Sequence, residues 1–205
     1  MRKVQRMSRN AWGVLCGIIF LTAQNISADT VADSGNRPSP FAIGITEEAQ
    51  FPDSQMDIMG FRLCLIYGRH ANVSGLDIGV FGCSVDGSLF GLQTSAVLNY
   101  IGSSSGSLQI AGIANNCLED FYGFQIAGIA NNASGDCIGA QIGTFDMTKG
   151  MYGAQIGVFN KAENAIGLQI GVVNWSKRMQ GVQLGLINVI EDSKCPYMLI
   201  LNAYF

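Results

Sequence analysis

A unit of glycine, an apolar residue, glutamine and isoleucine recurs through most of this 205-residue chain. Clear copies begin between Gly123 and Gly181, and looser copies reach back to Gly75. Self-similarity at a short, fixed period is typical of repeat architectures and restricts the fold more than composition does. The steps from Asp77 through the glutamines are 16, 16, 16, 16, 14, 14 and 14 residues. The recurring positions are Gln93, Gln109, Gln125, Gln141, Gln155, Gln169 and Gln183, with asparagines such as Asn160, Asn174 and Asn188 behind them.

Within each unit, apolar and polar or small residues alternate. In the copy at Gly167, Leu168 and Ile170 point to one side and Gln169 points to the other. A period of two over this length predicts a β-strand. Glycine, serine, aspartate and lysine separate the copies, at 134–136, 148–150 and 176–177 for example, and favour turns. The sequence therefore predicts an all-β domain at 61–205, with about ten strands.

The N-terminus has the layout of a secretory signal peptide. Four basic residues lie among the first nine, an uncharged apolar run covers 11–23, and Ala28 is a small residue at the expected cleavage site. Removal of 1–28 takes away four of the 12 basic residues and none of the 15 acidic ones, which leaves a net charge of −7. This charge argues against a nucleic-acid partner. Residues 29–60 are expected to form an extended lead-in, with one extra strand at 41–45.

The first candidate architecture is a repeat-built antiparallel sheet, closed into an outer-membrane-type β-barrel of about ten strands. A tilted membrane-spanning strand needs about 9–11 residues, which the repeat supplies. The chain ends in Phe205, with Leu201 and Leu199 alternating behind it, which is typical of an assembly signal for outer-membrane barrels. This interpretation implies outer-membrane lipid and the barrel-assembly machinery as partners.

The alternative is a β-solenoid with 14–16 residues per coil. Equal residues at equal places lie above one another in a parallel stack, so glutamines and asparagines would form hydrogen-bonded ladders. Gln109 to Asn115 spans one residue more than Gln169 to Asn174, which indicates a bulge inside some strands. The sequence leaves both architectures open, with the barrel ranked first.

No group of residues predicts catalysis or a cofactor. His70 is the single histidine and is expected to be solvated in a turn. The acidic pairs Glu119–Asp120 and Glu191–Asp192 are expected to be solvated at strand ends. Five cysteines follow the signal peptide at irregular spacings that fit no zinc or redox motif, so they are expected to be small core residues with at most one or two disulfides. The expectation is a protein that is not an enzyme and that holds no metal.

The glycine–apolar–glutamine–isoleucine units resemble an uncharacterised bacterial surface-repeat family with tandem GLQIGLVN-type copies behind a signal peptide. The resemblance covers 61–205, with departures at Gly82 and Asp146, where asparagine is usual, and at Ser107, where glycine is usual. It implies a location in the bacterial envelope and no known activity. The expected function is therefore a structural or surface protein of the outer membrane, with a secreted or surface-attached β-solenoid adhesin or binding protein as the alternative.

Overall fold

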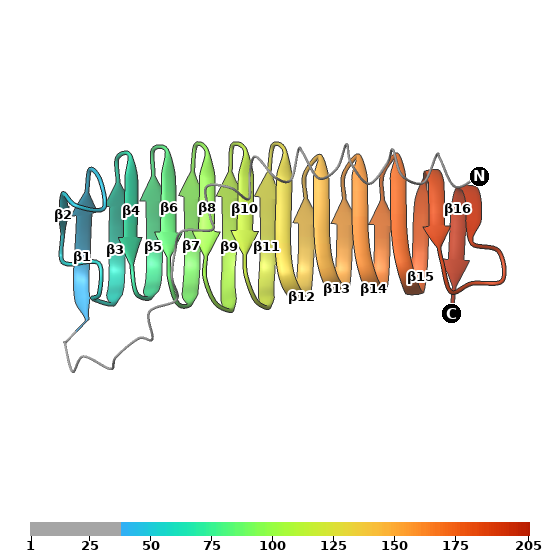
Figure 1. Cartoon of the computed structure of the whole chain (residues 1–205), viewed down its shortest axis with the longest axis horizontal. Coiled ribbons are helices and arrows are strands. Elements are labelled where there is room, and N and C mark those ends of the chain that lie inside the picture. The colour runs from blue at the N-terminus through green and yellow to red at the C-terminus, as the bar shows by residue number, and fades with distance from the viewer. Residues whose placement is uncertain (1–37) are drawn as a thin grey trace, which may run out of the picture. The chain divides into compact units, whose positions relative to one another are not determined.

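A computed structural model describes residues 38–205 of the chain. These residues form a single 16-stranded sheet system in which most neighbouring strands are parallel (Figure 1). The fold is a β-solenoid of about nine turns. The all-β prediction is confirmed and the solenoid alternative is correct. The antiparallel barrel is wrong, because equal positions of successive repeats pair in register, as Gln155 does with Gln141 and Gln169.

Each coil contributes two strands, not the single strand per repeat that the sequence predicted. We call the sheet that carries the repeat glutamines the glutamine sheet, and the opposite one the asparagine sheet. The glutamine sheet begins with β3 (Ile58–Cys64), β5 (Val73–Gly79), β7 (Leu89–Ser95), β9 (Ser105–Ala111) and β11 (Phe121–Ala127). The asparagine sheet begins with β4 (Tyr67–His70), β6 (Gly82–Val85), β8 (Leu98–Ile101) and β10 (Ala114–Cys117).

The later coils are tighter, and one bent strand passes through both sheets. These strands are β12 (Ala130–Ile142), β13 (Phe145–Ile156), β14 (Phe159–Ile170) and β15 (Val173–Ile190). The turns expected at 134–136, 148–150 and 176–177 fall where β12, β13 and β15 bend from the asparagine sheet to the glutamine sheet, so they are corners inside continuous strands and not hairpin turns. The expected bulge is also misplaced: the additional residue between Gln109 and Asn115 lies at the corner 111–113, where the tighter coils have only two residues, as at 171–172.

Two rows of side chains fill the space between the sheets. One row lies beside the glutamines and runs in register through Ile58, Val73, Leu89, Ser105, Phe121, Cys137, Met151, Ala165 and Met179. The facing row on the asparagine sheet includes Val85, Ile101, Cys117, Ala133 and Ala162. All of these residues are buried. Since the rows add residues of one coil to those of the next, the core is continuous along the stack.

The repeat glycine is required by the backbone. Gly153 has φ +139°, a conformation that favours glycine. A Cβ on Gly153 would also collide with the carbonyl oxygen of Gly139 in the preceding coil. The same combination recurs at Gly75, Gly91, Gly123, Gly139, Gly167 and Gly181.

The two ends of the stack differ from its middle. At the first coil, β1 (Ser39–Gly44) pairs in parallel with β3 and carries the two-residue strand β2 (Gln50–Phe51). β1 contains residues 41–44 and so confirms most of the extra strand expected at 41–45. At the last coil, β16 (Tyr197–Tyr204) pairs antiparallel with β15 and is exposed except at Asn202 (Figure 1). The predicted signal peptide, 1–28, lies outside the described residues.

Candidate functional site

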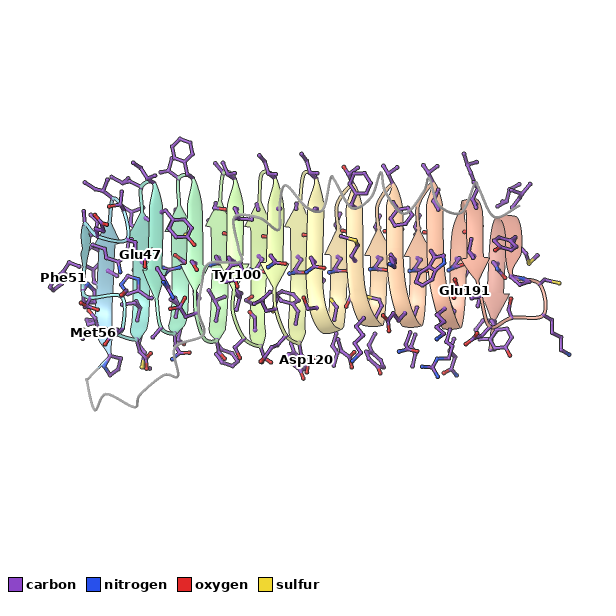
Figure 2. All side chains as sticks on the ribbon, viewed as in Figure 1. Glu47, Phe51, Met56, Tyr100, Asp120 and Glu191 are labelled. Carbon is purple, nitrogen blue, oxygen red and sulfur yellow. The ribbon has the colours of Figure 1, made fainter. Side chains whose placement is uncertain are left out.

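The glutamines form a hydrogen-bonded ladder inside the solenoid. From Gln109 onward, the side-chain amide nitrogen donates to the amide oxygen of the glutamine one coil earlier, while Gln93 Nε2 donates to Asp77 Oδ2. Gln155 Nε2 donates to Gln141 Oε1 at 2.8 Å, for example, and Gln169 Nε2 donates to Gln155 Oε1 at 2.7 Å. Gln93, Gln109, Gln125, Gln141, Gln155, Gln169 and Gln183 are all buried members of this ladder. Figure 2 shows a row of nitrogen- and oxygen-bearing side chains along the middle of the stack.

The asparagines form a second ladder, whose donors point toward the following coil. Asn160 Nδ2 donates to Asn174 Oδ1 at 2.7 Å, and Asn174 Nδ2 donates to Asn188 Oδ1 at 2.8 Å. Each of these two amides also donates to a backbone carbonyl, and all three residues are buried. The two ladders satisfy polar groups that would otherwise be costly in the core.

The asparagine ladder is interrupted at Asp146. Asn131 Nδ2 donates to Asp146 Oδ1 at 2.8 Å. On the other side, Asp146 Oδ2 and Asn160 Oδ1 have no hydrogen-bond partner among the described residues. These two acceptors lie 2.9 and 3.0 Å from the point that a Cβ on Gly157 would occupy, so they are neighbours. Burial raises the pKa of Asp146 to about 6. A proton on Oδ2 would provide the missing donor.

An ion pair ends the glutamine ladder in the first coils. Arg62 and Asp77 stand at glutamine positions of β3 and β5, and both are fully buried. Arg62 Nε donates to Asp77 Oδ1 at 2.7 Å, Arg62 Nη2 donates to Oδ2 at 2.5 Å, and Gln93 Nε2 adds a bond to Oδ2 at 2.9 Å. Burial lowers the pKa of Arg62, but the Asp77 carboxylate outweighs this effect and raises it overall. Arg62 therefore keeps its charge, and both carboxylate oxygens of Asp77 accept hydrogen bonds from it.

His70 lies beside this ion pair and not in a solvated turn. It is a buried residue of β4, and its Nδ1 lies 3.3 Å from Arg62 Nη1. Burial and the Arg62 guanidinium lower the pKa of His70 to about 4, so the imidazole is neutral at pH 7. The expected solvated position is wrong, because the residues after Gly68 complete a strand of the asparagine sheet.

Two cysteines share this end of the core. Cys64 of β3 and Cys83 of β6 are buried, and their sulfurs lie within 4.8 Å of each other and of an Asp77 carboxylate oxygen. Cys117 and Cys137 are core residues farther along the stack, and burial raises the pKa of their thiols to about 11 and about 12. Cys195 is exposed, and none of the cysteines in the described part of the chain is in a disulfide.

The outer surface of the glutamine sheet is apolar. We call this surface, with the adjoining bend, the apolar face. One row contains Met59, Phe90, Tyr122, Ile138, Tyr152 and Ile166, the next contains Ile110, Ile126, Ile142, Ile156, Ile170 and Leu184, and the bend contains Val80, Ile113, Ile129, Val158 and Val172. Each of these side chains is at least 36% exposed. The outward positions of the face between Met59 and Ile187 carry no aspartate, glutamate, lysine or arginine.

The charged residues gather elsewhere on the coils. Lys149, Lys161, Glu163, Lys177 and Arg178 lie on the asparagine sheet or on the bend that follows it. The acidic pair that includes Asp120 also lies on this bend, and Figure 2 places Asp120 at the lower edge of the stack. Glu119 accepts hydrogen bonds from Ser103 and Ser104 at the surface. The charged side chains named here thus lie away from the apolar face.

The last strand places Phe205 at the end of the apolar surface. Phe205 is 87% exposed, and Tyr197, Leu199 and Ile200 of β16 are each more than 70% exposed. Its role as an assembly signal stays a prediction, and the expected barrel-assembly partner depended on the barrel. Within residues 38–205, no helix is long and apolar enough to cross a bilayer.

No family model, curated protein or solved structure matches the chain. The resemblance to the bacterial surface-repeat family therefore stays a prediction. The fold defines the class of the protein as a parallel β-solenoid with amide ladders in its core.

Sequence reasoning missed the buried cluster of Arg62, Asp77, His70, Cys64 and Cys83. A signal was present, because Arg62 and Asp77 occupy glutamine positions in consecutive repeats, and opposite charges at stacked positions predict an ion pair. The cysteine pair had no such signal. Cys64 and Cys83 occupy different positions of the repeat, and only the coil geometry brings them together.

Proposed function

We propose that this protein is a non-enzymatic β-solenoid of the bacterial envelope that lies on a lipid surface through its apolar face. The predicted signal peptide supports export, and the resemblance to a surface-repeat family supports the envelope as the destination. The observation that carries the proposal is an exposed, charge-free row of large apolar side chains in nearly every coil.

The size of the apolar face favours an interaction surface. A strand rises about 3.3 Å per residue, and neighbouring coils lie about 4.8 Å apart, so the area of the apolar face is roughly 1,000 Å². The largest apolar patch on a typical soluble monomer is about 300–600 Å². A face of this size left in water would promote aggregation, so it is expected to be covered in the cell.

The chemistry of the face favours lipid as the occupant. Lipid tails offer no hydrogen-bond partners, so a surface that contacts them must have its backbone groups paired already. The backbone groups of the glutamine sheet are paired between coils, as in the registers of β12 with β13 and of β13 with β14. A face without charge can also lie at the boundary between lipid headgroups and acyl chains. The charged residues of the asparagine sheet and of the bend that follows it would then remain in water.

Vesicle flotation tests the proposal. The protein should float with uncharged phosphatidylcholine vesicles, and binding should persist in 1 M salt because the face has no charges to screen. The test variant combines Ile142→Glu with Ile156→Glu, which are exposed neighbours in register on the apolar face. We expect its partition coefficient to fall at least about tenfold, which corresponds to about 1.4 kcal/mol.

The matched control combines Met147→Glu with Lys161→Glu. These residues are also neighbours in register in the same two coils, but they lie on the asparagine sheet. Its partition coefficient should stay within about twofold of wild type, and circular dichroism should show that both variants fold. Wild-type protein that does not float, or equal binding by both variants, contradicts the proposal. A dimer that only the Ile142→Glu/Ile156→Glu variant loses, without vesicle binding, would identify a second copy as the occupant.

A further inference from the structure

The sulfur atoms of Cys64 and Cys83 lie within 4.8 Å of each other in the first coils. Cys64 ends β3 on the glutamine sheet, and Cys83 lies in β6 on the asparagine sheet of the following coil. Both side chains point into the core, with exposed fractions of 1% and 0%. A link between them would therefore join two sheets and two successive coils.

Glycines leave room for both sulfurs. Gly68 of β4 pairs in register with Cys83, and a Cβ on Gly68 would collide with Cys64 Sγ. Gly79 of β5 pairs in register with Cys64, and a Cβ there would lie 2.5 Å from Cys83 Sγ. The two thiols thus take the space of side chains that these glycines lack.

We propose that Cys64 and Cys83 form a disulfide that clasps the N-terminal coils of the solenoid. The end of a solenoid has a neighbouring coil on one side only, so it is the place where a cross-link adds most to order. The two residues are 19 positions apart in sequence, so the bond closes a loop of moderate length in the unfolded chain.

The pKa shifts of the two thiols reflect their contact in the folded core. A hydrogen bond from Cys83 and the nearby Arg62 guanidinium lower the pKa of Cys64, although burial opposes them. The hydrogen bond to Cys64 and burial raise the pKa of Cys83. Both shifts arise from the contact between the two sulfurs, which lie within 4.8 Å of each other in the folded core.

The oxidant is a second disulfide, either a small molecule or an oxidase protein. The Cys64 thiolate attacks one sulfur of that disulfide, and a mixed disulfide forms as the first thiolate leaves. Cys83, after losing its proton, attacks Cys64 Sγ and releases the second thiolate. Two cysteine thiols are oxidised, one disulfide is reduced to two thiols, and two electrons and two protons move to the oxidant. Because both sulfurs are buried, the exchange takes place before the first coils close.

A metal ion fits the same atoms less well. Asp77 has both carboxylate oxygens bound by Arg62, and Oδ2 also accepts from Gln93. A divalent cation at this site would lie beside the Arg62 guanidinium, and like charges at this depth repel strongly.

Peptide mapping tests the disulfide. The full chain is refolded in a glutathione redox buffer, free thiols are alkylated in denaturant, and trypsin with chymotrypsin separates the cysteines. We expect one cross-linked pair of peptides that contains Cys64 and Cys83, at a mass two hydrogens below that of the free peptides. Reduction should also lower the urea midpoint of unfolding.

Single variants make the assignment specific. Cys64→Ser and Cys83→Ser should each abolish the link, while Cys117→Ser, at an equally buried position, should leave it in place. Full alkylation of Cys64 and Cys83 after oxidation overturns the proposal, as does a link from either of them to another cysteine. Stoichiometric zinc that Cys64→Ser removes also overturns it. None of these results depends on membrane binding, so this experiment tests the disulfide independently of the proposed lipid-binding function.

Discussion

At the residue scale, the core of this solenoid contains two ladders in which an interior amide both donates to one neighbouring coil and accepts from the other. Gln155 shows the arrangement, since it donates to Gln141 and accepts from Gln169. A side chain in such a ladder can be replaced only by one with the same donor and acceptor. Asp146 breaks this rule, because an ionised carboxylate has no donor for Asn160.

Asp146 therefore makes stability depend on pH. Its folded pKa of about 6 lies above the unfolded value, so the folded state holds the proton more tightly. The stabilisation is complete below pH 4 and is lost as pH rises through about 6. We expect Asp146→Asn, which restores the donor, to be more stable than wild type at pH 8 by at most about 3 kcal/mol, as measured by urea unfolding.

Comparing wild type with Asp146→Asn isolates the contribution of Asp146 to the pH dependence of stability. His70 acts in the opposite direction, because its folded pKa of about 4 lies below the unfolded value and its stabilisation is lost as pH falls. This contribution cancels in the difference between wild type and Asp146→Asn. The buried thiol of Cys137, whose pKa Asp146 raises further, stays protonated over this range. The control is Glu163→Gln, an exposed change in the next coil. A difference that does not vary between pH 4 and 8 would count against the account.

At the scale of the element, the repeat glycine fixes the path of each coil. Gly153→Ala should destabilise the protein by more than about 3 kcal/mol, because alanine is strained at φ +139° and its Cβ collides with the Gly139 carbonyl. The matched control is Gly106→Ala, whose Cβ would meet only the exposed ring of Phe90 at 3.0 Å. Thermal unfolding compares them, and equal losses of stability would be inconsistent with a backbone requirement.

The sequence predicted part of this element and missed the rest for physical reasons. The strand with Gln169 was visible because its apolar side chains alternate with polar ones. The direction of pairing was not, since parallel and antiparallel strands share a period of two. The segment 134–136 was interpreted as a hairpin turn, because Ser134 and Asp136 favour turns in isolation. In the coil, neighbouring strands on both sides hold the same residues extended.

At the scale of the whole described region, the ladders, the glycine contacts and the apolar face all repeat with the coil. The argument that equal residues of successive repeats stack on one another predicted the correct architecture. The barrel interpretation gave more weight to strand length and to Phe205, which are compatible with both folds. The apolar face follows from the same repeat, because one exposed isoleucine per coil gives a continuous row.

The distance between two repeats tests the stacked architecture most directly. Ser74 and Gln180 occupy the same exposed position seven coils apart, as the registers from β5 to β15 show. Spin labels at these two sites can be placed in a Cys195→Ser background, because the other cysteines of the described region are buried. At about 4.8 Å per coil, the solenoid predicts a separation of about 34 Å by pulsed electron paramagnetic resonance. A separation below about 20 Å, as in a sheet whose first and last repeats come together, would contradict the solenoid.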